Sequence, residues 1–286
     1  MTSQTDHSTP TTATNPSTAP FRFGLVAMPR PGMDWLELAR RVEGLGFDSL
    51  LVPDNLDATA PIVANAAAAA VTERLTVGPY VIATPLRSPG LVAADAAALH
   101  QISAGRVEMG LGAGRPDSKA EAGRLGIPFG TPAERMAHLE QTITAVRERT
   151  PEVRITVAAS GPRMLALAGR TADVVALGAS PFADEAEIAR MGRIVTDAAA
   201  VAGRQVVLNT NLSAVGDDIP AWLEERMGLT VDRLLATGAA SYLRGSAAEM
   251  AETLQRRREV TGVSYVCAGV DNADRLAPLV ELLKGG

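Results

Sequence analysis

Cysteine is almost absent from this sequence, since Cys267 is the only one. A lone cysteine excludes an internal disulfide framework and favours a protein of the reducing cytoplasm. We expect Cys267 to be a small buried residue rather than a nucleophile. Histidine is also scarce: His7 lies near the start, and His100 and His138 fall mid-helix, where a structural role is expected. Multi-histidine metal sites are therefore not expected, and no metal ion is predicted.

Long hydrophobic runs are missing as well, so no membrane-spanning helix is expected. The first 20 residues contain thirteen Ser, Thr and Pro residues. This composition is typical of a disordered tail, and the segment lacks the cationic and apolar parts of a secretory signal. The net charge is −5, which argues against nucleic acid or an anionic membrane as the partner. We expect a cytoplasmic protein whose partner is a small-molecule substrate.

What the chain does contain is a regular alternation of strand and helix patterns, with 47% apolar residues in all. Several strands are almost wholly apolar, which is typical of a parallel sheet covered on both faces. The predicted strands are Arg22–Met28, Ser49–Pro53, Thr76–Ala83, Arg106–Leu111, Arg154–Ala158, Asp173–Leu177, Val206–Ser213 and Ser264–Ala268. The predicted helices are Asp34–Leu45, Thr59–Thr72, Ser88–Ser103, Pro132–Arg149, Pro162–Arg170, Ala183–Ala202, a composite Pro220–Gly262, and Asp274–Lys284.

Eight strands that alternate with helices predict an α/β fold, a (β/α)8 TIM barrel. No Pro- or Ser-rich linker interrupts residues 21–286, so we predict a single barrel domain there after a tail of residues 1–20. The alternative is an open, doubly wound parallel sheet, which the same alternation allows. In a barrel, function lies at the carboxyl ends of the strands, so the loops that follow the strands form the candidate site.

Two strand ends carry small residues suited to a ligand. The strand Arg106–Leu111 runs into alternating glycines, Gly110–Gly114, where bare backbone can approach a flat or phosphorylated ligand. The turn Ala158–Gly161 precedes Pro162, which fits the first position of a helix. Free amides and the helix dipole would make this turn an anion site, and the alternative is an ordinary strand-to-helix turn.

Four segments, in this order, resemble the luciferase-like monooxygenase superfamily. They read DSLLVPDN from Asp48, SAGRVEMGLGAG from Ser103, ASGPRMLALAGRTADVVALG from Ala159, and SYLRGSAAEMAETLQRRREVTGVSYV from Ser241. Within it, residues 22–284 most resemble the oxidoreductases that use the deazaflavin coenzyme F420. The resemblance implies a bacterial luciferase-like barrel that holds a flavin-type ring at its C-terminal mouth.

The resemblance also implies which residues form the site. A bulge with a non-proline cis peptide, assigned to Tyr80–Val81, lies behind the ring. The turn Ala158–Gly161 binds the cofactor phosphate, Gly112–Gly114 lies near the ring, and Asp54–Asn55 borders it. The expected catalytic residues are Asn55, Tyr80 and Arg115. The expected cofactor-binding residues are Asp54, Asn55, Tyr80, Val81, Gly112, Gly114, Ala158, Ala159, Ser160, Gly161, Pro162 and, from its place after a strand end, Ser180.

The chain departs from the deazaflavin-dependent relatives at three places. Asn55 stands where many have histidine, and asparagine cannot shuttle a proton near pH 7. Arg115 stands where the sugar-phosphate dehydrogenases place an acid, which favours another hydride transfer over oxidation of a sugar phosphate. The long inserted segment that many relatives carry after the fourth helix is nearly absent here, because the strand from Arg154 follows Arg149 closely. The site is therefore more open, or is closed by residues 115–130.

Several polar residues near the strand ends allow two interpretations. Arg115 and Arg87 would each clamp a carboxylate or phosphate, or be ordinary loop arginines. Asn211 and Ser213 are expected to face the barrel lumen, as contacts to a ring edge or substrate or as buried fillers. Tyr80 would stack on a ring or donate a proton, or belong to the core.

The predicted function is hydride transfer between F420 and an unidentified small organic molecule, with reduction favoured. Lys119 and Lys284 are the only lysines among 27 Lys and Arg residues, which is typical of a GC-rich, actinobacterial genome and favours this cofactor. One alternative is a monooxygenase that uses FMN and oxygen. A second is a non-catalytic flavin-binding protein. A homodimer packed through the early helices and a cofactor-reducing partner enzyme are further expectations.

Overall fold

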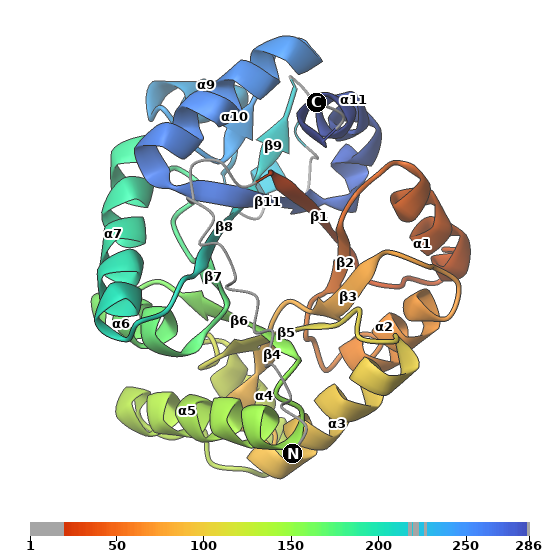
Figure 1. Cartoon of the computed structure of the whole chain (residues 1–286), viewed down its shortest axis with the longest axis vertical. Coiled ribbons are helices and arrows are strands. Elements are labelled where there is room, and N and C mark those ends of the chain that lie inside the picture. The colour runs from red at the N-terminus through yellow and green to blue at the C-terminus, as the bar shows by residue number, and fades with distance from the viewer. Residues whose placement is uncertain (1–19, 217–218, 220–222, 226–227, 285–286) are drawn as a thin grey trace, which may run out of the picture.

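The computed structural model describes residues 20–216, 219, 223–225 and 228–284, and its strands form a ring enclosed by helices (Figure 1). The predicted tail lies outside the described residues, apart from Pro20. None of the helices described is long and apolar enough to cross a membrane.

The strands are β1 (Arg22–Val26), β2 (Ser49–Val52), β3 (Thr76–Pro79), β4 (Ile82–Ala83), β5 (Glu108–Gly112), β6 (Arg154–Ala159), β7 (Val174–Leu177), β8 (Val207–Leu212), β9 (Ala214–Val215), β10 (Tyr242–Leu243) and β11 (Val263–Gly269). The α-helices are α1 (Trp35–Gly44), α2 (Pro61–Ala69), α3 (Pro89–Ile102), α4 (Ser118–Leu125), α5 (Pro132–Arg149), α6 (Pro162–Thr171), α7 (Glu185–Val201), α9 (Val231–Ala236), α10 (Ala247–Thr261) and α11 (Ala273–Lys284). Two short 3-10 turns, η1 (Thr84–Leu86) and η2 (Val270–Asn272), complete the described elements.

Nine parallel strands form one sheet, in the order β3-β2-β1-β11-β8-β7-β6-β5-β4. The predicted strand Thr76–Ala83 is divided into β3 and β4 around a cis peptide bond between Tyr80 and Val81. Together, β3 and β4 occupy one strand position of the barrel, so the barrel has eight strand positions. A parallel bridge between Val77 and Val107 joins β3 to the chain just before β5 and closes the ring. The (β/α)8 barrel is therefore confirmed, and the open doubly wound sheet is wrong.

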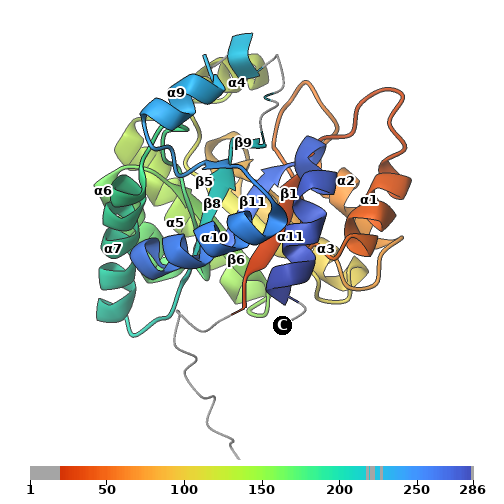
Figure 2. The ribbon, with the colours of Figure 1, turned by 90° about the horizontal axis from the view of Figure 1, so that it is seen from above.

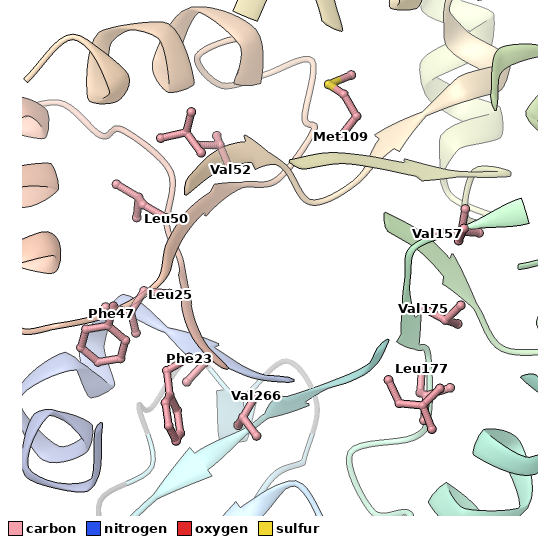
Figure 3. Close-up of a cluster of buried hydrophobic side chains, with 14 of the residues drawn as sticks. Phe23, Leu25, Phe47, Leu50, Val52, Met109, Val157, Val175, Leu177 and Val266 are labelled. Carbon is pink, nitrogen blue, oxygen red and sulfur yellow. The ribbon is translucent and has the colours of Figure 1, made fainter. Parts of the chain in front are cut away.

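The main apolar core lies between the strands and the surrounding helices. Figure 3 shows Phe23, Leu25 and Val266 among side chains that point outward from the ring of strands. Helix α1 illustrates how the sequence builds this layer: Asp34 caps its first turn by accepting from the backbone N–H of Glu37, 3.0 Å away. Its apolar stripe is buried against the sheet, as the three- and four-residue spacing predicts.

Two parts of the C-terminal mouth differ from the prediction. Helix α4 was not expected, because eight residues with a weak apolar pattern follow a loop. The composite helix Pro220–Gly262 is wrong: its described part contains α9, the short strand β10 and α10. Strand β10 pairs with β9 in a second, two-stranded sheet. Figure 2 shows α4 and α9 at the same end of the barrel, above the strands.

Barrel closure depends on glycine at two neighbouring positions. A Cβ added to Gly78 would lie 1.8 Å from the carbonyl oxygen of Glu108, and one added to Gly110 would lie 2.2 Å from that of Pro79. The two backbones are held there by a hydrogen bond from Val77 N to Arg106 O, 2.9 Å long. Because the clash is with backbone, a side chain at either glycine would push the strands apart.

The lower barrel lumen is polar, in contrast to the apolar layer outside the sheet. The buried carboxylate of Glu108 accepts from Arg22, 3.1 Å away, and from the Thr156 hydroxyl, 2.6 Å away. The Arg22 guanidinium lies 4.2 Å from the centre of the Tyr265 ring, and the Tyr265 hydroxyl lies 2.5 Å from that of Ser49. Burial raises the pKa of Tyr265 well above its ordinary value, so this phenol stays neutral.

We predict that Gly78→Ala destabilises the barrel by at least about 3 kcal/mol, because overpacking against backbone cannot relax. Urea unfolding followed by circular dichroism measures the effect. Gly90→Ala is the control, since a Cβ there meets nothing within 4 Å in α3; it should leave stability unchanged or raise it by up to about 1 kcal/mol. A Gly78→Ala protein as stable as the parent would contradict this account of closure.

Candidate functional site

A pocket of about 460 Å³ opens at the carboxyl ends of the strands. This size is typical of sites for small molecules and cofactors. Nearly half of the residues that line it have little or no side chain: Ala83, Gly112, Ala113, Gly114, Ala158, Ala159, Ser160, Ala176 and Gly178. Backbone is therefore exposed over much of the wall, which suits a flat ligand.

A larger cavity, of about 980 Å³, opens at the opposite end of the barrel. Half of its charged lining residues form ion pairs: Lys284 contacts Asp48 at 2.7 Å, Arg22 contacts Glu108 at 3.1 Å, and Asp274 contacts Arg41 at 2.5 Å. The amino ends of barrel strands usually serve stability. We therefore take the smaller pocket at the carboxyl ends as the candidate site.

One wall of the pocket is formed by the break between β3 and β4. The predicted cis peptide between Tyr80 and Val81 is confirmed, and both residues line the pocket. A Cβ added to Gly112 would lie 2.8 Å from Cγ2 of Val81. Glycine in β5 therefore lets Val81 pack closely against the neighbouring strand, and this contact shapes the wall.

The floor of the pocket is a chain of polar side chains that crosses the lumen. The Tyr80 hydroxyl donates to Oδ1 of Asn209 at 2.5 Å and accepts from Nδ2 of Asn211 at 3.1 Å. Asn209 is fully buried, whereas Asn211 is exposed to the pocket. Burial raises the pKa of Tyr80 well above its ordinary value, so its hydroxyl is neutral at physiological pH. The expected inward orientation of Asn211 is thus observed.

Asp54 lines the pocket, and both oxygens of its carboxylate accept hydrogen bonds. Its carboxylate accepts from both terminal nitrogens of Arg87, one of them at 2.7 Å, and from the backbone N–H of Ala83 at 3.1 Å. The ring nitrogen Nε2 of His138 lies 2.9 Å from the carbonyl oxygen of Arg87 and fixes the other side of this loop. Arg87 is therefore a partly buried structural partner of Asp54, and His138 has the structural role expected of it.

The rim of the pocket carries a positively charged side chain and the uncapped N-terminus of a helix. Helix α6 begins at Pro162 after the N-cap Gly161, and no side chain caps it. Its first-turn amides and the helix dipole therefore suit an anion. Arg115 lines the rim, has a side chain 78% exposed, and lies 3.4 Å from Asp117. This distance allows a weak, solvated ion pair that a ligand anion could replace.

The structure brings together most of the predicted site residues but not all. Asn55 is not among the residues that line the pocket, because its Oδ1 accepts from the backbone N–H of Asp57 at 2.8 Å and caps a turn. Ser180 similarly accepts from Phe182 N, 3.2 Å away, at the surface. The predicted residues that do line the pocket are Asp54, Tyr80, Val81, Gly112, Gly114, Arg115, Ala158, Ala159 and Ser160.

Two predicted residues lie just outside the pocket lining, and several lining residues were not predicted. Gly161 and Pro162 were predicted to bind the cofactor and lie next to the lining at the start of α6. Asn211, Met164 and Ser118 line the pocket but were not assigned to the site. Alternation along β8 placed Asn211 toward the lumen, and only the contact with Tyr80 shows that it reaches the floor.

The family model described as luciferase-like monooxygenase matches residues 17–151. The match covers just under half of the chain. This stretch contains the wall formed by Tyr80 and Val81 and the glycines of β5, so the resemblance drawn from the sequence is confirmed.

Curated relatives cover part of the chain. It is 32% identical over 173 residues to an F420-dependent glucose-6-phosphate dehydrogenase of Beutenbergia cavernae, spanning 49% of this chain and 51% of that protein. It is 30% identical over 166 residues to the enzyme of the same name from Intrasporangium calvum, spanning 46% and 50%. The chain thus spans about half the length of the curated relatives it matches.

Solved structures share the fold over nearly the whole chain. An F420-dependent secondary alcohol dehydrogenase in complex with an F420–acetone adduct superposes with a TM-score of 0.72 and 19% identity, covering 93% of this chain and 98% of that one. The FMN-bound oxygenating constituent of 3,6-diketocamphane monooxygenase from Pseudomonas putida superposes with a TM-score of 0.70 and 16% identity, covering 93% and 96%. At these identities the likeness establishes the barrel.

We predict that Asp54→Asn destabilises the protein by about 2 to 4 kcal/mol, because it leaves the Arg87 guanidinium, 18% exposed, without its partner. The double variant Asp54→Asn/Arg87→Gln should cost less than the sum of the single changes. Asp57→Asn, which breaks the exposed pair with Arg124, is the matched control and should change stability little. If the effects of Asp54→Asn and Arg87→Gln on the free energy of unfolding in urea are additive, the two residues do not act as a structural pair.

Cys267 should be unreactive in the folded protein. It is fully buried, and burial raises its pKa to about 12, so the nucleophilic thiolate is absent at neutral pH. Labelling by a chromogenic disulfide reagent should be slow and flat between about pH 7 and 9, and fast after unfolding in urea. Rapid labelling of folded protein that rises through about pH 8.5 would show an accessible thiol.

Proposed function

We propose that this protein transfers a hydride between coenzyme F420 and a small organic substrate. The observation that carries the proposal is the glycine- and alanine-walled pocket at the carboxyl ends of the strands, which ends at the uncapped start of α6. Curated relatives named as F420-dependent dehydrogenases support it, as does a relative named 5,10-methylenetetrahydromethanopterin reductase. The substrate is not specified by the pocket or by these names.

The residues of the pocket fit such a cofactor. Bare backbone at Gly112 and Gly114 leaves room for a flat ring against the wall at Tyr80–Val81. At Gly161, an added Cβ would meet nothing within 4 Å, so the start of α6 is open to a phosphate. Ala158–Gly161 would hold that phosphate through backbone amides. When bound, F420 supplies or accepts the hydride at C5, and it does not readily support oxygen activation.

The chain itself supplies orientation and electrostatics. Asp54 is the only carboxyl group among the described lining residues, and it is paired with Arg87. The Tyr80 hydroxyl donates to Asn209, so in this arrangement it does not donate toward the pocket. Arg115 would attract an anionic tail or substrate at the rim. These features favour a hydride transfer that needs no strong acid from the protein.

Further parts of the proposal concern the setting of the enzyme. We place it in the cytoplasm, as a single barrel domain of residues 21–286 behind a tail of residues 1–20, with a partner enzyme that regenerates the cofactor. A homodimer packed through the early helices is supported by exposed apolar side chains, Val63 on α2 and Leu91 on α3, which are 64% and 53% exposed.

Equilibrium titrations with F420 and FMN, followed by cofactor fluorescence, test the proposal. We expect F420 to bind with a dissociation constant in the micromolar range or below, and FMN to bind more weakly. Ser160→Asp places a charge before α6, where it should repel the phosphate tail and weaken F420 binding about tenfold. Ser88→Asp adds the same charge at the start of α3, at a residue that does not line the pocket, and should leave binding unchanged.

The other outcomes of these titrations each have a meaning. Preference for FMN would favour the oxygen-using monooxygenase. Binding of neither cofactor would remove the support for an F420 oxidoreductase. Tight binding of F420 without turnover by any reductant and acceptor would indicate a non-catalytic flavin-binding protein.

A further inference from the structure

The hydrogen bonds at the floor of the pocket have one direction, which starts at a backbone carbonyl. Nδ2 of Asn209 lies 3.1 Å from the carbonyl oxygen of Tyr265 and must donate to it, since a carbonyl can only accept. The same nitrogen lies 3.3 Å from the sulfur of Cys267. The amide of Asn209 is therefore oriented with Oδ1 toward Tyr80, and the Tyr80 hydroxyl donates to it at 2.5 Å.

This direction fixes the next amide along the chain. Because the Tyr80 hydrogen is committed to Asn209, its oxygen acts as an acceptor toward Asn211. Asn211 therefore presents Nδ2 to Tyr80, at 3.1 Å, and turns Oδ1 away. Within the described part of the chain, no other hydrogen bond is formed by the Asn211 side chain. One N–H and the carbonyl of a planar, oriented amide thus remain free at the pocket floor.

We propose that Asn211 binds a cyclic amide edge, a carbonyl beside an N–H, of the molecule that enters this pocket. The N–H that points away from Oδ1 holds Tyr80, and the N–H beside Oδ1 pairs with the ligand carbonyl while Oδ1 accepts from the ligand N–H. Asparagine makes this two-bond pairing with matching edges of nucleobases. Tyr80 and Asn209 are positioning residues, because they act by fixing the rotation of Asn211.

The inference rests on the proposed function only for the source of the amide edge. The pyrimidinedione end of a deazaflavin or flavin ring carries such an edge, and so would a substrate that is a lactam, an imide or a pterin. Both sources share the same chemistry at Asn211. Two ligand series are therefore needed, one without any cofactor tail and one with the complete cofactor.

Lumazine, a fluorescent bicyclic pyrimidinedione, is the probe without a tail, and 1,3-dimethyllumazine is its partner that lacks both ring N–H groups. Fluorescence titration of the wild-type protein should show lumazine binding about tenfold tighter than 1,3-dimethyllumazine, the effect of one lost hydrogen bond and an unpaired acceptor. Asn211→Leu should bind the two probes equally. Tyr80→Phe should keep part of the discrimination, because Asn211 remains but is free to rotate.

The same variants are then titrated with F420. Weaker F420 binding by Asn211→Leu would assign the amide edge to the cofactor ring, and unchanged F420 binding alongside lost lumazine discrimination would assign it to the substrate. If wild-type protein discriminates the lumazines but binds neither F420 nor FMN, the proposed function fails and the inference about Asn211 stands. Equal discrimination by Asn211→Leu and wild-type protein, or no binding of lumazine to wild-type protein, would overturn it.

Discussion

The close approach of β3 to β5 is the constraint on which the rest of the structure depends. Gly78 and Gly110 let two backbones meet where any Cβ would clash with a carbonyl, and this contact turns a nine-stranded sheet into a closed ring. This close contact continues toward the carboxyl ends of the strands at Gly112, where Val81 packs closely and forms a wall of the pocket. Closure of the fold and the shape of the candidate site therefore have one physical origin.

The outward and inward faces of the barrel strands carry different kinds of side chain. Outward side chains are apolar and pack under the helices, which provides most of the stabilisation by burial (Figure 3). Inward side chains include polar groups that bond to one another, at Glu108 toward the lower end and at Tyr80, Asn209 and Asn211 toward the mouth. Such a lumen holds amides in single orientations, because each buried donor needs its acceptor. These hydrogen bonds therefore determine how the side chains of the candidate site are oriented.

Much of the fold could be predicted because it depends on local patterns: the strand and helix alternation, and the cap at Asp34. Helix α4 and strand β10 were missed because they are short and are held by tertiary contacts. At the site, the cis peptide followed from the family resemblance, whereas the turn that holds the Asn55 side chain away from the pocket lining did not. The bonds from Asp54 to Arg87 and from Tyr80 to Asn209 join residues far apart in sequence, so spacing alone could not reveal them.

We propose that the pocket at the carboxyl ends of the strands binds a deazaflavin ring against Tyr80–Val81, with its tail at the start of α6. A crystal structure of the protein with F420 tests this most directly. We expect the ring within the pocket of about 460 Å³ and a phosphate oxygen within hydrogen-bond reach of the amides around Gly161. A ring bound in the cavity at the opposite end of the barrel, or a phosphate held away from α6, would contradict it.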